Sequence, residues 1–317
     1  MPPLYDSAFP LPPKHSAEFP GVPASPETRT AILNAGSPIS QAELDEQYLY
    51  TLLQPPHPEL DQAIDGGDAD RVLYELAAAR SRFNPDATFN TAIDRAIKCG
   101  RVDIMRLLME NGIPVNTEHL EAAARSGHVL VLAHLIEHLS WPVNEVSDHG
   151  LTLLTLAVEN RDMVMWLLSQ GADINKEDAY SETPLSRAAQ NGTEAVIMTL
   201  LERGADVTRG APLQASLLRK EGNANLEVTR KLLAWGAPVD KFAGENSSLW
   251  EAAAFEQMTA LHVACYGSHR NLAAVRLLLQ HGADPRLNKR FADGELPNTS
   301  AFDSAQRRGY TDIIAVM

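Results

Sequence analysis

The sequence of 317 residues has few cysteines, few aromatic residues and a deficit of basic charge. Its two cysteines, Cys99 and Cys265, have no disulfide-like spacing, which favours a reducing compartment, so we expect the cytosol or the nucleus. Lys and Arg number 27 against 41 Asp and Glu, and this balance argues against direct binding to nucleic acid or to an anionic membrane. No apolar run is long enough to predict a membrane span or a signal peptide.

Motifs of common enzymes are also missing from the sequence. We find no G-x-S-x-G, no Gly-rich phosphate loop with Lys and Ser or Thr, and no H-E-x-x-H. His262, Cys265 and His269 would lie on one side of a continuous helix, as zinc ligands can, but Gly267 and Ser268 interrupt the helical pattern and no fourth ligand follows at metal spacing. We therefore expect no enzyme, no metal and no cofactor.

The most informative stretch runs over residues 182–207, ETPLSRAAQNGTEAVIMTLLERGADV. Thr183 is a good N-cap and Pro184 follows at the first helical position, so the pattern predicts a short helix with a narrow apolar face. Asn191 and Gly192 break this helix, a second apolar stripe follows, and Gly204 is suited to a left-handed cap. Neither helix can bury its face alone, which predicts a stack of similar units.

Further copies of this unit occur along the chain. Strong and partial copies lie at 92–116, 121–144, 151–175, 228–240, 259–285 and 299–317, with a degenerate first copy from Glu59. The T-P-L-H-x-A and L-L-x-x-G-A-D elements, spaced by about 33 residues, resemble the ankyrin repeat over roughly 60–317. The resemblance implies an all-α solenoid of about eight helix-turn-helix units with β-hairpin tips, in a family that usually binds other proteins and catalyses nothing itself.

The predicted organisation has three parts. Residues 1–24 contain seven prolines and predict a disordered tail, residues 25–58 predict one or two short helices that cap or link, and 59–317 form the repeat domain. The last unit stops early, so either its final helix is short and acts as a cap, or the chain ends before a natural boundary. We expect a monomer.

The expected function is a non-catalytic scaffold or adaptor for a protein partner, whose identity the sequence does not reveal. The resemblance places the binding surface on variable positions of the first helices, facing a concave groove. This row carries five basic residues and one acid, which predicts a basic groove for an acidic segment, unless the charges alternate without forming a groove. Its candidate binding residues are Arg95, Lys98, Arg125, Arg187, Gln190, Asn191, Arg219 and Tyr266, with Leu156, Glu159, Asn160, Leu218 and Val263 in the same row.

A second candidate surface is an insertion at 241–257, KFAGENSSLWEAAAFEQ. It lengthens one hairpin, and insertions in solenoids project from one face that often binds partners. Leu249, Trp250 and Phe255 make it unusually aromatic for this chain. They either pack back on their own hairpin or form an exposed apolar anchor, a residue class that dominates interface energetics.

The N-terminal Pro2-Pro3-Leu4-Tyr5 resembles P-P-x-Y ligands of WW domains, in which a proline pair and a tyrosine occupy adjacent aromatic pockets. Pro2, Pro3 and Tyr5 suggest, as one alternative, a ubiquitin-ligase substrate adaptor that contacts a WW-domain protein. A second alternative is a transcriptional regulator that acts through a DNA-binding partner, because the sequence has no basic DNA-binding segment of its own.

Overall fold

The structure is a computed structural model that describes residues 58–80, 85–219, 226–243, 257–266, 271–291, 294–295 and 298–317. The predicted tail, the predicted helices between residues 25 and 54, and most of the 241–257 insertion lie outside these residues. All described residues belong to one unit, residues 55–317.

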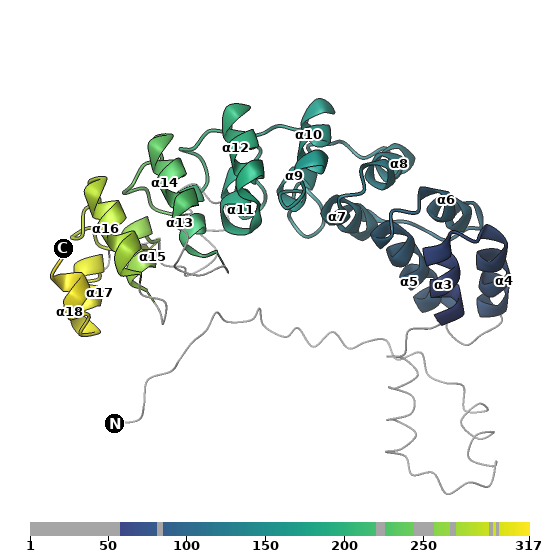
Figure 1. Cartoon of the computed structure of the whole chain (residues 1–317), viewed down its shortest axis with the longest axis horizontal. Coiled ribbons are helices and arrows are strands. Elements are labelled where there is room, and N and C mark those ends of the chain that lie inside the picture. Colours follow the sequence, from purple (N-terminus) through teal and green to yellow (C-terminus); the bar gives the residue numbers. More distant parts are fainter. Residues whose placement is uncertain are drawn as a thin grey trace, which may run out of the picture. The chain divides into compact units, whose positions relative to one another are not determined.

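The described helices form eight consecutive pairs, as the sequence predicted (Figure 1). The first helix of each pair contacts the first helices of its neighbours and belongs to what we call the inner layer. The inner layer consists of α3 (Pro58–Gly66), α5 (Pro85–Lys98), α7 (Thr117–Ser126), α9 (Leu153–Leu156), α11 (Pro184–Asn191), α13 (Pro212–Leu217), α15 (Ala260–Cys265) and α17 (Ala301–Arg307).

The second helix of each pair packs on the first and belongs to the outer layer. The outer layer consists of α4 (Ala69–Arg80), α6 (Val102–Glu110), α8 (Val129–Leu139), α10 (Arg161–Ser169), α12 (Glu194–Glu202), α14 (Glu227–Ala234), α16 (Leu272–Gln280) and α18 (Thr311–Ile314). Strands β1 (Arg290–Phe291) and β2 (Gly294–Glu295) pair antiparallel, with Arg290 opposite Glu295. Two isolated antiparallel bridges, Val146 with Thr152 and Gln257 with Arg290, mark two other loops.

Inner-layer helices begin with a recurring cap in which a polar side chain accepts the amide of the third helical residue. Thr183 accepts from the Ser186 amide and Pro184 occupies the first turn, as predicted. In four other units the third helical residue also bonds back to the amide of the cap residue, which makes a reciprocal capping box. These boxes join Asn116 with His119, Thr152 with Thr155, Thr259 with His262 and Ser300 with Asp303. The position therefore favours a polar group that bonds backbone amides and not one particular residue, although α13 begins after Ala211 without a side-chain cap.

A continuous core runs between the two layers and is made mostly of Ala, Leu, Ile and Val. Small residues such as Ala188 and Ala189 are fully buried on the inner layer, which lets α11 and α13 approach closely. Bulky residues such as Leu200 and Ile197 fill the space beneath α12. Each unit leaves apolar surface for the next unit to cover, so stacking stabilises the array.

Candidate protein-binding site

Helix α9 is much shorter than its inner-layer neighbours. It ends at Leu156 after one turn, whereas α7 and α11 continue for ten and eight residues. The next residues form a turn in which Val158 is buried, and the side chain of Asn160 then accepts the Met163 amide to start α10. The missing second turn of α9 leaves space between its two neighbours.

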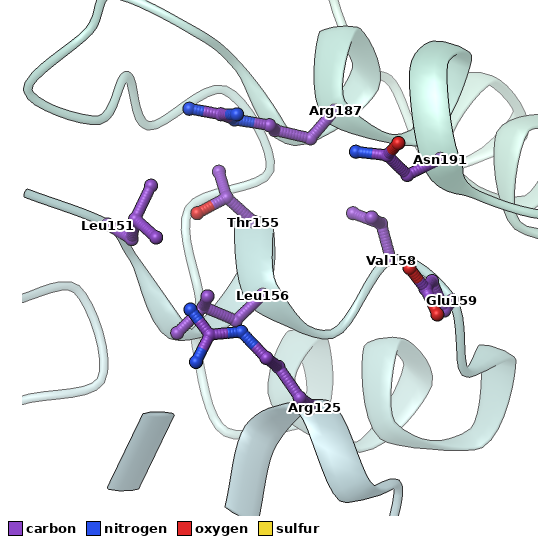
Figure 2. A pocket seen from close by; sticks show the side chains of 8 residues that line it. All are labelled: Arg125, Leu151, Thr155, Leu156, Val158, Glu159, Arg187 and Asn191. Atoms are coloured by element: carbon purple, nitrogen blue, oxygen red, sulfur yellow. The ribbon is translucent and has the colours of Figure 1, made fainter. Parts of the chain in front are cut away.

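A cavity of about 230 Å³ fills this space (Figure 2). Figure 2 shows Arg125 of α7 and Arg187 of α11 on opposite sides of Leu151 and Thr155. The cavity adjoins a more open depression of about 740 Å³, with which it shares Arg125, Leu151 and Arg187. We call the two together the α9 groove, and its lining residues are Glu121, Arg125, His149, Leu151, Thr155, Leu156, Val158, Glu159, Tyr180, Glu182, Arg187 and Asn191.

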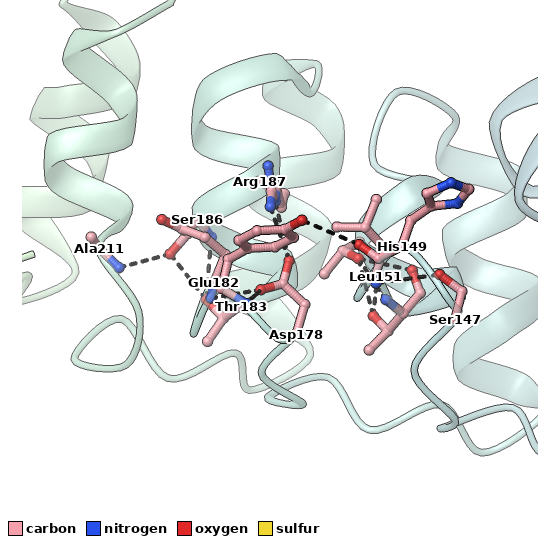
Figure 3. A network of polar contacts seen from close by, with 12 residues as sticks. Ser147, His149, Leu151, Asp178, Glu182, Thr183, Ser186, Arg187 and Ala211 are labelled. Carbon is pink, nitrogen blue, oxygen red and sulfur yellow. Dashed lines mark hydrogen bonds and ion pairs between the residues drawn. The ribbon is translucent and has the colours of Figure 1, made fainter. Parts of the chain in front are cut away.

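Arg187 is held by a buried carboxylate of its own unit. The side chain of Asp178 is fully buried, and one of its oxygens accepts from Nε and Nη2 of Arg187 at 3.3 and 3.1 Å (Figure 3). Its other oxygen accepts the backbone amides of Tyr180 and Glu182 at 2.9 and 3.0 Å. Four donors thus fix the carboxylate, and the carboxylate fixes the guanidinium beside the groove.

Arg125 is held in a similar way by Glu121, whose side chain is 4% exposed. Nη2 of Arg125 lies 3.3 Å from one Glu121 oxygen, and Nδ1 of His149 lies 2.9 Å from the other. Burial alone would raise the pKa of the Glu121 carboxyl, but hydrogen bonds with Ser147 and His149, and the charge of Arg125, outweigh burial and lower this pKa. Glu121 is therefore ionised at neutral pH.

These pairs change the charge expected of the surface. Two arginines line the α9 groove together with three acids, Glu121, Glu159 and Glu182, so this part of the surface is not basic. The sequence predicted a basic groove because its row of candidate residues contains Arg125 and Arg187 but neither Glu121 nor Asp178, the carboxylates that pair with them. Each of these carboxylates neutralises the arginine that it holds in place.

The other predicted basic residues of the row lie apart from the groove. Arg95 pairs with Asp65, and Nη1 of Arg95 is 3.8 Å from a carboxylate oxygen of Asp61. The guanidinium of Arg219 donates to three carbonyls at the end of α11, those of Ala188, Ala189 and Gly192.

Four further residues that the sequence predicted to bind a partner differ in how far their side chains are exposed to solvent. Lys98 and Asn191 are exposed, Gln190 is half-buried, and Tyr266 is 51% exposed. Leu249, Trp250, Phe255 and the N-terminal Pro2, Pro3 and Tyr5 lie outside the described residues. That any of these residues contacts a partner stays a prediction.

Sequence reasoning missed several groove residues, among them Glu121 of α7 and the loop residues His149 and Tyr180, and it also missed Asp178, the loop carboxylate that holds Arg187. His149 and Tyr180 sit at equivalent places in successive hairpin loops, and the Tyr180 hydroxyl donates to the His149 carbonyl at 3.4 Å. The sequence feature that could have identified His149 and Tyr180 is that each lies three residues before the Thr that caps the next helix, Thr152 and Thr183 respectively. Hairpin tips belong to the binding surface that the resemblance implies, but the sequence alone did not show which tips carry ligand-facing side chains.

Two of the three residues considered as metal ligands, His262 and Cys265, have structural roles, and His269 lies outside the described residues. Nδ1 of His262 accepts from the Thr259 amide at 3.2 Å within the cap of α15. Cys265 is fully buried, and burial raises the pKa of its thiol to about 12. Over the described part of the chain, no group of three or more His, Cys, Asp or Glu residues is arranged to hold a metal ion. In the same residues, no helix is both long enough and apolar enough to cross a membrane.

Comparison with known proteins identifies the repeated unit. Two family models match the chain, ankyrin repeats in three copies over residues 120–211 and an ankyrin repeat over residues 256–290. The ankyrin repeat and KH domain-containing protein mask-1 of Caenorhabditis elegans is 27% identical over 259 residues, which cover 80% of this chain and 8% of that protein. The putative ankyrin repeat protein FPV219 of fowlpox virus is 27% identical over 159 residues, 46% of this chain and 36% of that protein.

The chain thus spans well under half the length of these two curated relatives. Among solved structures, the human ASB11 ankyrin repeat domain has a similar fold, with a TM-score of 0.50 and 24% identity. The match covers 71% of this chain and 97% of that domain. Ankyrin repeats are generally non-enzymatic modules that bind other proteins, and such repeats imply a protein partner here. The matched models and the eight stacked helix pairs together show that this chain is built from ankyrin repeats.

Proposed function

We propose that this chain is a non-catalytic protein-binding scaffold that holds an extended segment of its partner in the α9 groove. The observation that carries the proposal is the single-turn helix α9, which opens a groove between two longer helices. Ligand sites are typically concave and contain a few polar groups held in fixed positions, and the α9 groove is a hollow in which carboxylates hold Arg125 and Arg187 in place. Its binding groups are set in place before a partner arrives, which lowers the entropic cost of association.

The chemistry of the groove favours a neutral, mainly apolar segment. Leu151, Leu156 and Val158 supply apolar surface, while Arg125 and Arg187 supply N–H donors at its sides. Because both guanidiniums already pair with buried carboxylates, a partner carboxylate would gain little, whereas backbone carbonyls of an extended segment can accept the remaining N–H groups. Binding should then depend only weakly on salt concentration.

A random-peptide phage library selected against the full chain tests this proposal. The enriched peptides that bind the groove should be apolar with little net charge. Glu159→Trp, which places a bulky ring at the rim of the groove, should weaken their binding by about tenfold or more. Glu137→Trp is the matched control, because Glu137 is exposed on the outer helix α8. Equal binding to both variants, or enrichment of strongly acidic peptides by the groove, would contradict the proposal.

The insertion at 241–257 is proposed as a second contact of the scaffold. Support comes from its two ends, which are tied together. The Ala243 amide donates to the Met258 carbonyl at 3.1 Å, Gln257 and Arg290 exchange backbone hydrogen bonds of 2.8 and 3.2 Å, and Arg290 lies 4.0 Å from the centre of the buried Phe242 ring. A short Gly-Ser link can therefore join Ala243 to Gln257 in place of residues 244–256.

Affinity capture with mass spectrometry from a source-cell lysate should compare the full chain with this replacement. Proteins that are retained by the full chain and lost from the variant would support a contact through the insertion. Identical captured proteins would remove the insertion from the proposal and leave the α9 groove to account for binding. The thermal unfolding midpoint of the variant, if equal to that of the full chain, shows that the repeats remain folded.

A further inference from the structure

Charge is distributed unevenly along the chain. Residues 257–317 carry seven Lys and Arg against five Asp and Glu, whereas the whole chain has a net charge of −14. The last two units are therefore weakly basic on an acidic protein. An anionic partner segment that the rest of the molecule repels could approach this end.

One exposed tyrosine is the meeting point of two of these cations. Tyr266 follows α15, and its ring is 51% exposed. Nζ of Lys289 and Cζ of Arg308 each lie 5.1 Å from the centre of this ring, within the range of cation–π attraction. Lys289 comes from the segment before β1 and Arg308 from the end of α17, so three chain segments converge on one side chain.

The two cations differ in exposure. Lys289 is 7% exposed and supports the ring from inside the fold, while Arg308 is exposed. Among the described residues the guanidinium of Arg308 makes no hydrogen bond or ion pair, in contrast to Arg187 and Arg219, which are held by a carboxylate and by carbonyls. The Tyr266 hydroxyl likewise makes no hydrogen bond to a described residue. Both groups therefore have donors that a ligand can use.

We propose that Tyr266, Lys289 and Arg308 form a recognition cluster for an acidic peptide segment, one rich in Asp and Glu. A carboxylate beside Arg308 would accept from its guanidinium and from the Tyr266 hydroxyl, as charge-assisted hydrogen bonds. A neutral ligand would form only weaker hydrogen bonds with these donors. Tyrosine and arginine are enriched among residues that dominate interface energies.

The cluster lies on units seven and eight, whereas the α9 groove lies on units three to five. It rests on the proposed function in one respect, because it assumes that the ligand is a protein segment. Nucleic acid fits less well, since phosphate backbones require many Lys and Arg contacts and this chain carries an excess of acids.

Fluorescence anisotropy of labelled deca-glutamate with the full chain tests the cluster, with a Gly-Ser peptide of equal length as the neutral probe. We expect deca-glutamate to bind, the Gly-Ser peptide not to bind, and affinity to fall as salt rises. Arg308→Gln should weaken binding about tenfold, the loss of one charge-assisted contact. Tyr266→Phe keeps the ring and should weaken binding by a smaller factor.

Arg276→Gln is the matched control, because Arg276 is exposed on α16 and its replacement changes the net charge equally. Equal loss in Arg276→Gln and Arg308→Gln, no binding of deca-glutamate, or tighter binding of duplex DNA would overturn the proposal. The groove variant Glu159→Trp should bind deca-glutamate like the unmodified chain. Failure of the cluster is thereby distinguished from failure of the α9 groove.

Discussion

The Asn144 side chain joins two successive units by accepting the backbone amide of Asp173 at 2.7 Å. Its amide group also donates to the Gly171 carbonyl at 3.0 Å. The link recurs one unit later, where the Asn175 side chain accepts the Asp206 amide at 2.8 Å. An amide side chain is suited to this place because it can donate and accept at once, and so satisfies two backbone groups of the next loop.

Asn144→Ala should therefore lower the free energy of unfolding by about 1–2 kcal/mol, the net value of two hydrogen bonds, although Asn144 is exposed. Urea unfolding followed by circular dichroism measures the change. Asn191→Ala is the control, because Asn191 is exposed and its side chain makes no hydrogen bond to another described residue. If the two variants unfold alike, the Asn144 link contributes nothing to the stability of the stack.

Replacement by alanine should lower the stability of the fold by different amounts at Gly192 and at Gly204. A Cβ atom on Gly192 would lie 2.8 Å from the Val158 carbonyl oxygen and 2.9 Å from Cα and O of Ala188, all backbone atoms that cannot move aside. Gly192→Ala should cost about 2–3 kcal/mol through overpacking where two units meet. Gly204 has open space around it but a φ of +92°, so Gly204→Ala should cost about 1 kcal/mol of backbone strain.

The thermal unfolding midpoints of Gly192→Ala and Gly204→Ala can be compared directly, because both variants add one methyl group to a glycine. Gly192→Ala should show the larger fall in midpoint. Equal falls would mean that the contact between Gly192 and Val158 relaxes without cost.

Local signals in the sequence were enough to predict the repeats. Thr183 and Pro184 predict a helix start, Gly204 predicts a left-handed helix end, and both predictions are confirmed because each depends on backbone chemistry within a few residues. The early end of α9 was not predicted, since the apolar residues before Asn160 also fit a longer helix. Sequence pattern alone does not decide between a second helical turn and a buried turn at Val158.

The charge of the groove could not be predicted for a different reason. His149 and Glu121 are 28 residues apart, and Arg187 and Asp178 are nine apart across a loop and a cap. Such pairs depend on how one unit sits on the next and on how a hairpin folds back, neither of which periodicity determines. The row of arginines indicated a basic surface, but Arg187 is neutralised by the loop residue Asp178 and Arg125 by Glu121, one turn earlier on the same helix. The pairing of Glu121 with Arg125 follows from helical spacing and could have been predicted.

The partly buried charge of Glu182 in the α9 groove should make the free energy of unfolding depend on pH. It lines the groove beside Arg187 and is half-buried. Burial raises the pKa of its carboxyl, Arg187 opposes that rise in part, and the nearby Asp178 carboxylate adds to it. The folded chain therefore binds this proton more tightly than the unfolded chain does, so the free energy of unfolding falls as pH rises from the ordinary glutamate pKa through the raised one. At neutral pH the free energy of unfolding therefore stays lower than it would be without the partly buried Glu182 charge.

Glu182→Gln should accordingly raise the thermal unfolding midpoint at pH 7, because the amide keeps the shape without the buried charge. The advantage should disappear below the ordinary glutamate pKa of about 4.3, where the native carboxyl is already protonated in both states. Glu202→Gln, at an exposed position on α12, is the control and should show no such change with pH. A variant that is less stable than the native chain at pH 7 would show that the ionised Glu182 is held by favourable contacts, and would assign it a supporting role beside Arg187 instead.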